Sequence, residues 1–243
     1  MNVFDCIFNR RGVRSFKREP VDDKLIGVML YSATQAPSAG NTQEWQFVVV
    51  KDAEMRKKLA DAALRQGFIA EAPVVIVVCA DLEKISMRFG KRGEALYGVQ
   101  DTANATMLMM LAAHALGLST CWVGAFDEDA VSHVVELPEK FKPVAIVPVG
   151  YALESPEKPE RIPFETLASV NAFGKKYDIS YAAGPDQGKE IRFTPIGDYI
   201  EGAFKKAEKS VKMSVGKKIA GEEGKEGGKK KLTFSEFLRR LAK

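Results

Sequence analysis

Hydrophobic residues form nearly continuous runs at four places in the first 151 residues, a pattern that is typical of β-strands. The runs cover residues 47–50, 74–80, 119–126 and 144–151. The run at 74–80 is mostly β-branched, so it predicts a strand that is covered on both faces. The run at 119–126 breaks at Gly124, and Pro148 in the last run indicates a sheet edge or a bulge.

Between these runs, apolar residues recur three and four positions apart, which predicts amphipathic helices. The expected helices cover residues 2–10, 25–35, 54–66, 101–117 and 129–137. The helix at 101–117 is apolar on nearly all sides, so we expect it to be a buried central helix with Gly117 as its C-cap. It is too short, and too interrupted by Asn104 and His114, to predict a membrane span.

Residues 81–98 carry no clean period, because glycines alternate with charged side chains. We expect a mobile excursion over a site, or a short helix with loops. Arg88, Lys91 and Arg92 in this segment could hold a phosphate group, although a solvated charged face is the better interpretation.

The composition is that of an ordinary globular protein, with 243 residues of which 46% are hydrophobic and 28% charged. This length is enough for one sizeable core with an appendage. The three cysteines, Cys6, Cys79 and Cys121, are far apart and show no metal-ligand spacing, and the latter two are expected to be inert buried thiols. The N-terminus has no signal pattern, so the sequence predicts a reducing cytoplasm.

The net charge of +4 is unevenly distributed. Residues 172–243 hold 17 Lys/Arg and 10 Asp/Glu, whereas the first 171 residues hold 19 and 22. We therefore expect a body at 1–171, an extension at 172–215 that packs on the body or the partner subunit, a flexible Gly/Lys/Glu linker at 216–231 and a short amphipathic helix at 232–243. This helix most simply docks on another protomer. Membrane binding is less favoured, and nucleic-acid binding least, because acidic residues dilute the lysines.

Polar and flexible residues gather at 36–45, between a predicted helix and a predicted strand. Pro37 fixes one backbone dihedral, whereas Gly40 and Asn41 tolerate conformations that other residues avoid. Such a loop can present backbone N–H groups, the Ser38 hydroxyl and amide side chains to a flat ligand with donors and acceptors on its rim. An ordinary helix-to-strand connection explains the loop equally well.

Arg10, Arg11 and Arg14 lie within five residues, beside Gly12, where a short predicted helix ends. Guanidinium groups match the geometry of phosphate and keep their charge, so this segment favours anion capture. A solvated basic turn explains the segment taken alone at least as well. Of the two histidines, His114 is expected in the core or at an interface, and His133 on the surface.

Four segments, in this order along the chain, are similar to the signatures of the FMN-dependent nitroreductase family. They are residues 10–16, 36–45, 112–124 and 149–161. Each is degenerate alone, but together they are specific for the body of the chain. The resemblance implies an α+β, three-layer fold with a central, mostly antiparallel sheet flanked by helices, in an intertwined homodimer that holds FMN at the subunit interface.

The resemblance also implies which residues bind FMN. The groups along its phosphate, ribityl chain and ring edge would come from one protomer, namely Arg10, Arg11, Gly12, Arg14 and Arg161. The other protomer would supply the loop residues Pro37, Ser38, Ala39 and Asn41. A backbone N–H near the flavin N5 would come from Val123, Gly124 or Ala125, and Gln66, with Arg65 beside it, would touch the ring.

Two positions depart from the family pattern. The family often has Ser where Gly12 stands, so one phosphate contact through a hydroxyl is lost. It often has Pro where Glu44 stands, a difference that bears on the rigidity of the loop rather than on chemistry.

The activity implied by the resemblance is that of an NAD(P)H oxidoreductase, with NADH or NADPH as co-substrate, ping-pong hydride transfer through the flavin N5, and a nitroaromatic, quinone or flavin as acceptor. No catalytic side chain is expected, because a flavin carries the chemistry and the protein binds, orients and tunes it. Arg14 would stabilise the anionic reduced flavin, and Gly124 would orient N5. Three alternatives stay open: a reductive dehalogenase, an oxygen-dependent flavin-fragmenting enzyme, and a flavin-binding protein without turnover.

Overall fold

The structure is a computed structural model, and it describes residues 2–162 and 166–176. The chain divides into two compact units, Met1–Glu160 and Arg161–Lys243. The expected linker, terminal helix and most of the extension lie outside the described residues, so the boundaries at 171, 215 and 231 stay predictions. In the second unit, residues 169–176 form a tight turn in which Asn171 and Gly174 have positive φ.

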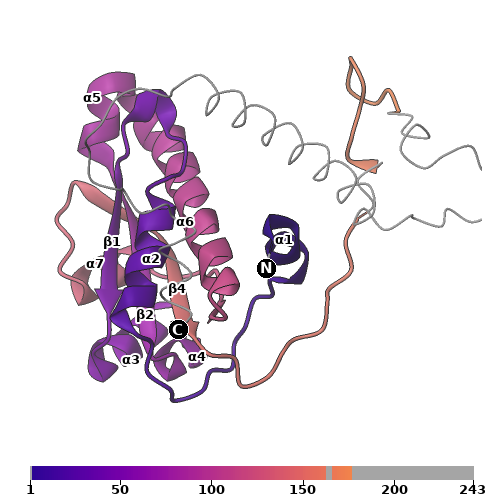
Figure 1. The fold of residues 1–243 in the computed structure, drawn as a ribbon. Helices are drawn as coiled ribbons and strands as arrows, with labels where there is room; N and C mark the ends of the chain where they lie inside the picture. The colour runs from indigo at the N-terminus through magenta and orange to yellow at the C-terminus, as the bar shows by residue number, and fades with distance from the viewer. Residues whose placement is uncertain (1, 163–165, 177–243) are drawn as a thin grey trace, which may run out of the picture. The chain divides into compact units, whose positions relative to one another are not determined.

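One antiparallel sheet runs through the first unit (Figure 1). Its strands are β1 (Trp45–Val50), β2 (Val74–Asp81), β3 (Ser119–Thr120) and β4 (Phe141–Gly150), in the order β1-β2-β4-β3. Every residue of β2 is buried, which confirms the prediction of a strand covered on both faces. The predicted strands at 47–50 and 144–151 are confirmed as β1 and β4, each of which begins a few residues earlier than expected.

The run at 119–126 forms only the two residues of β3 because the next position faces Pro148. The carbonyl of Pro148 accepts the N–H of Cys121 at 3.4 Å, but Pro148 has no N–H to return, so the regular ladder ends there. The expectation for Pro148 itself is wrong, since β4 has a neighbour on each side. The bulge between β2 and β4 lies further along, where Val78 pairs with Ala145 and Cys79 with Pro143.

Seven α-helices and two irregular turns are present in the described residues. They are α1 (Val3–Asn9), α2 (Asp23–Ala33), η1 (Ala39–Asn41), α3 (Ala53–Ala62), α4 (Phe68–Glu71), α5 (Leu82–Arg92), η2 (Gly93–Tyr97), α6 (Gly98–Ala115) and α7 (Glu128–Val134). Side-chain oxygens cap the first turns of five helices, from Asn2, Asp22, Asp52, Asp81 and Asp127. Gly117 follows α6 with a φ of +81°, which confirms its expected capping role.

Residues 82–98 are helical, so of the two expectations for residues 81–98 the short helix agrees better with the structure, although no loop follows it before α6. The chain turns within α5 at Gly90, whose φ of +56° and ψ of −150° suit glycine, and then continues through η2 into α6. At Gly93 an added Cβ would lie 2.8 Å from the carbonyl oxygen of Ile85, so only glycine allows this close approach. Here the glycines permit a tight packing of helical turns instead of ending them.

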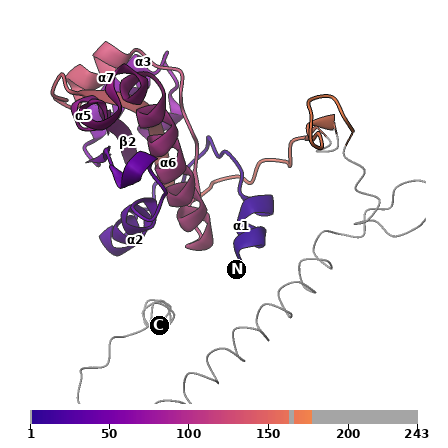
Figure 2. The same ribbon diagram turned by 90° about the horizontal axis from the view of Figure 1, so that it is seen from above.

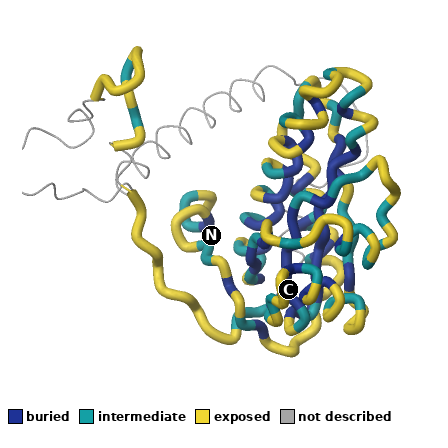
Figure 3. The backbone as a smooth tube through the Cα atoms, turned by 180° about the vertical axis from the view of Figure 1, so that it is seen from behind, coloured by how far each residue is buried: buried dark blue, intermediate teal, exposed yellow. Residues whose placement is uncertain are grey.

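The sheet separates two hydrophobic layers, as Figure 2 shows. Val74, Ile76 and Val78 of β2 pack with α2 and α6, whereas the alternate residues of the same strand pack with α3 and α7. The buried residues of Figure 3 follow the strands and the inner helix faces. The three-layer α+β prediction is confirmed. No helix in the described ranges has the length and apolarity that a membrane span requires.

Candidate functional site

The arginine-rich segment runs alongside β3. Gly12 forms a parallel bridge with Thr120, and the N–H of Val13 donates to the Thr120 carbonyl at 3.0 Å. Val13 and Phe16 are buried, whereas Gly12 and Arg14 are exposed. The segment is therefore anchored by its apolar residues, while the exposed residues between them are presented at the surface.

Among the predicted residues, Arg14 contacts the start of α4, and Gln66 contacts Ala125. The Arg14 guanidinium carbon is 5.7 Å from the centre of the Phe68 ring, at the start of α4. The Gln66 side chain donates to the carbonyls of Ala63 at 2.8 Å and Ala125 at 3.1 Å. Gln66 thus ties the end of α3 to the segment after β3, and the structure brings these separate sequence positions together.

The backbone conformations of Leu64 and Arg65 explain why α3 ends at Ala62, whereas the sequence predicted a helix that continues to residue 66. Leu64 and Arg65 have φ values of +58° and +60°, a region that side-chain-bearing residues rarely adopt. Both are exposed. Consecutive residues in this conformation reverse the chain and direct Gln66 towards Ala125, at a local cost of about 1–3 kcal/mol for each residue.

Of the three expected N5 donors, Val123 is already engaged. Its N–H donates to the Ile146 carbonyl at 2.9 Å, and its carbonyl accepts the Ile146 N–H at 3.0 Å. Gly124 and Ala125 are exposed, and no residue in the described part of the chain accepts a hydrogen bond from their N–H groups. Of the three expected donors, Gly124 and Ala125 are therefore the two whose N–H groups have no acceptor within the described residues.

Arg10 and Arg11 lie where α1 meets the C-terminal end of α6. Arg11 donates to the carbonyls of Phe8 at 2.8 Å and Arg10 at 2.9 Å, so part of its guanidinium caps α1. Burial, followed by the charges of Arg10 and Arg11, lowers the pKa of His114. Nε2 of His114 is buried without a hydrogen-bond partner among the described residues, an orphaned polar atom beside the proposed phosphate residues.

The thiols are buried, as expected. Burial raises the pKa of Cys79 to about 12 and also raises the pKa of Cys121, with Arg14 and Arg10 acting in the opposite direction. Cys121 lies behind the arginine segment, where a Cβ on Gly12 would be 3.9 Å from its sulfur.

The second predicted group, the loop that contains η1, is held from two sides. Gly40, Asn41 and Gln43 all have positive φ, and the Gln43 N–H donates to Ser38 Oγ at 3.0 Å. The Ala39 N–H donates to Asp101 Oδ2 of α6 at 2.7 Å. From α5, Arg88 donates to the Gly40 carbonyl and Lys84 Nζ to the Gln43 carbonyl at 3.0 Å.

Sequence reasoning missed Asp101, Lys84 and Arg88 as supports of this loop. Asp101 is 62 positions from Ala39, and no motif joins them. The one available signal was a lone acidic residue among the apolar positions at 101–117.

The two groups of predicted residues lie near opposite ends of α6. Asp101, in its first turn, holds the loop, whereas His114, in its last turn, is beside Arg10 and Arg11. Asp101 and His114 are thirteen positions apart, which corresponds to about 20 Å along a helix at 1.5 Å per residue. Figure 1 shows α5 at one end of α6 and α1 at the other. One chain alone therefore does not bring Pro37, Ser38 and Asn41 to the arginines.

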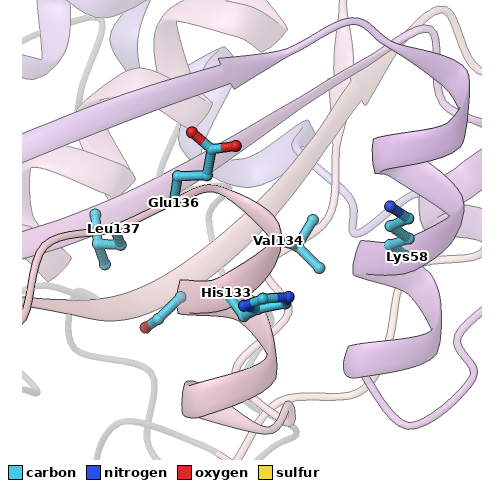
Figure 4. A pocket seen from close by; sticks show the side chains of 6 residues that line it. Lys58, His133, Val134, Glu136 and Leu137 are labelled. Atoms are coloured by element: carbon cyan, nitrogen blue, oxygen red, sulfur yellow. The ribbon is translucent and has the colours of Figure 1, made fainter.

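Two other regions add little to the site. Arg161 begins the second unit, so its place beside the arginine segment stays a prediction. A surface hollow between α3 and α7 contains none of the predicted residues (Figure 4). It is lined by Lys58, Ser132, His133, Val134, Glu136 and Leu137.

The chain is similar in sequence and fold to known proteins. The sequence model described as "Nitroreductase family" matches residues 7–67 and 62–151. An NADH dehydrogenase of Thermus thermophilus is 31% identical over 185 residues, which cover 65% of this chain and 90% of that protein. An FMN reductase [NAD(P)H] of Bacillus subtilis is 26% identical over 178 residues, covering 68% and 72% of the two chains.

Among solved structures, B. megaterium NfrA2 superposes with a TM-score of 0.66 at 27% identity, over 74% of this chain and 78% of that one. The antiparallel sheet, the helical layers and the matched segments thus agree with one another. The chain belongs to the nitroreductase family.

Proposed function

We propose that this protein is an FMN-dependent NAD(P)H oxidoreductase and that two copies of the chain enclose each FMN. Relatives named as an NADH dehydrogenase and an FMN reductase support the redox activity and the cofactor. Bound FMN supplies hydride and electron chemistry, so the protein needs groups that bind and orient it rather than a catalytic acid or base.

The proposal of a site shared by two chains depends on one observation: the arginine segment and the loop that contains η1 lie far apart within a single chain. Each chain holds cations at one end of α6 and an amide-rich loop at the other, about 20 Å apart by the rise of a helix. In a twofold dimer the same two surfaces meet twice, so antiparallel α6 helices would bring the arginines of one copy beside the loop of the other. This arrangement forms two equivalent sites.

In this proposal, Arg10 and Arg14 bind the phosphate and ring edge, with Arg161 as a third cation. Arg11 contributes less, because two of its hydrogen bonds go to carbonyls near the end of α1. The donor set fits the cofactor, since guanidinium groups pair with phosphate and permanent cations stabilise a ring that gains negative charge. Pro37, Ser38, Ala39 and Asn41 of the second copy line the remaining edge.

The exposed N–H groups of Gly124 and Ala125 orient the reacting edge of the ring. Gln66 holds this segment through the Ala125 carbonyl and does not use its N–H groups. A fixed backbone donor favours charge that develops at the atom it faces. Val123 positions these donors through its two hydrogen bonds with Ile146, so its own N–H is not the donor to the ring.

NADH or NADPH and the electron acceptor bind in turn at the same exposed face of the flavin ring. Because the first must leave before the second binds, ping-pong kinetics are expected. Nitroaromatics, quinones and free flavins are the acceptor class, since each accepts electrons without a dedicated acid-base residue. The widely spaced cysteines of the sequence support the reducing cytoplasm as the compartment.

The test begins with the visible spectrum and the mass in solution of the purified protein, after incubation with FMN. We expect bound flavin with one FMN per chain, a dimer, and NADH or NADPH oxidation that menadione or nitrofurazone accelerates. Arg10→Ala should lose FMN, while Lys58→Ala, which removes an exposed cation from the hollow between α3 and α7, should keep it. A monomer that takes up no FMN would contradict the proposal.

A further inference from the structure

Two carboxyl groups are buried beneath the loop that contains η1. Glu44 is the last residue before β1 and is 1% exposed, and Asp101 in the first turn of α6 is 6% exposed. Acidic side chains are almost never buried this deeply unless they are paired. Neither forms an ion pair with a described lysine or arginine, so the reason for their burial lies in the loop above them.

Each carboxyl group contacts the loop through a polar atom. Asp101 Oδ2 accepts the Ala39 N–H at 2.7 Å, and Glu44 Oε2 lies 2.7 Å from Thr42 Oγ1. Thr42 Oγ1 also lies 2.8 Å from the Ala39 carbonyl. A hydroxyl has one proton, so Thr42 can donate to the carbonyl or to Glu44 but not to both.

Oε1 of Glu44 is buried and has no donor among the described residues. The Asp101 carboxyl lies within hydrogen-bonding reach of the Glu44 carboxyl. Two ionised carboxylates offer acceptors only, so this contact would be repulsive unless one of them carries a proton. A single added proton gives the contact a donor and removes one of the two buried charges.

The cations on neighbouring elements have other partners and do not neutralise the two carboxyl groups. Lys84 and Arg88 of α5 donate to loop carbonyls, Asp81 at the end of β2 pairs with Lys140 at 3.3 Å, and Arg92 donates to the Tyr97 hydroxyl. Asp101 is the one charged side chain of the described structure whose field acts on Glu44. The pair is therefore isolated from compensating cations.

We propose that Glu44 holds a proton that it donates to Asp101, and that this hydrogen bond fixes the loop in the shape that binds FMN. The inference rests on the proposed function, because it deepens the role of that loop. Both are positioning residues that act through Ala39 and Thr42. Loss of the proton places two charges side by side, so Asp101 moves away from Glu44 and the hydrogen bond to Ala39 is lost. Gly40 and Asn41, both with positive φ, then lose their main anchor to α6.

The direction of the pH dependence follows from Glu44. Burial, and then the neighbouring Asp101, raises the pKa of Glu44 above its ordinary value of 4.5, whereas the hydrogen bond from Thr42 opposes the shift. Above pH 4.5 the folded protein therefore binds more protons than the unfolded chain. The stability associated with this proton is complete below pH 4.5 and is lost as pH rises through the raised pKa.

The first test is an infrared titration of wild-type protein without FMN. A protonated carboxyl has a C=O stretching band that a carboxylate lacks. We expect this band to persist above pH 4.5, the ordinary pKa of a glutamate, and to be lost as the pH rises further. Glu44→Gln and Asp101→Asn should each remove it, because an amide then supplies the N–H permanently. Glu54→Gln, at an exposed position of α3, should keep it.

The second test measures the dissociation constant for FMN against pH. Wild-type affinity should fall by up to about tenfold per pH unit above the raised pKa, whereas Glu44→Gln should show no such fall. Absence of the band from the wild-type protein, or an identical fall in Glu44→Gln, would overturn the inference. If FMN does not bind at any pH, the proposed function fails and the band still decides the proton on Glu44. If FMN binds but the band is absent, only this inference fails.

Discussion

Replacement of Gly150 by Ala tests how the end of β4 holds the arginine segment. Gly150 pairs with Ser119 of β3 and faces Pro73 and Phe16. A Cβ at this position would lie 2.6 Å from Pro73 Cδ, 3.0 Å from Pro73 Cγ and 3.1 Å from Phe16 Cδ1, where 3.4–4 Å is ordinary contact. Pro73 is a rigid ring fixed to the backbone just before β2, so it cannot rotate away.

The structure sets the magnitude of the effect. Either Pro73 or the buried Phe16 ring must move by several tenths of an ångström, and overpacking of this kind costs about 1–3 kcal/mol. For a chain of this size, each kcal/mol lowers Tm by about 2–4 °C, so we expect a fall of about 2–12 °C. Movement of Phe16 would also displace Arg14, two residues away, and weaken FMN binding.

The assay is thermal unfolding at one protein concentration, with saturating FMN and without it, because ligand and assembly both shift Tm. The control is Gly27→Ala, at an exposed position of α2 where a Cβ meets nothing within 4 Å. That change should stabilise the helix by about 0.5–1 kcal/mol. Equal Tm values for Gly150→Ala and the wild type would refute the packing argument.

Three further predictions concern single groups. With a pKa of about 12, Cys79 should be about one part in ten thousand thiolate at pH 8, so native protein should resist thiol labelling at this residue until it unfolds, and rapid labelling would count against burial. Asp127→Ala removes the oxygen that accepts the Ala130 N–H at 2.9 Å and should cost about 0.5–2 kcal/mol in denaturant unfolding, whereas Asp129→Ala should cost less. Arg14→Ala should lower the reduction potential of bound FMN in potentiometry, and an unshifted potential would remove its tuning role.

The sequence predicted the elements whose signal is local. The run at 74–80 is mostly β-branched and became a fully buried strand because each of its faces has a helical layer to cover it. Other boundaries depend on distant partners. The expected helix at 54–66 stops early because Leu64 and Arg65 adopt positive φ, which their residue types disfavour. The length of β3 depends on Pro148, 28 positions beyond Thr120.

In the candidate site, too, the features with a local sequence signal were predicted and those that depend on distant partners were not. The motifs identified the arginine segment and the loop, but not their supports, since Asp101 and Ala39 meet only after α2, β1, β2 and α6 have packed. Glu44 was expected to bear on loop rigidity rather than on chemistry, and the sequence did not indicate that it is buried or that burial raises its pKa. Likewise, no residue type signals that the Val123 N–H is used within the sheet.

The central claim is that each FMN is bound by the arginines of one copy and the loop of another. Two inactive variants, Arg10→Ala and Pro37→Glu, can be unfolded together and refolded, with each variant refolded alone as a control. If the site is shared, half of the dimers are mixed and each has one intact site, so about a quarter of the sites should regain FMN. Recovery near that fraction is the predicted result. No recovery from two folded, dimeric variants would contradict the claim.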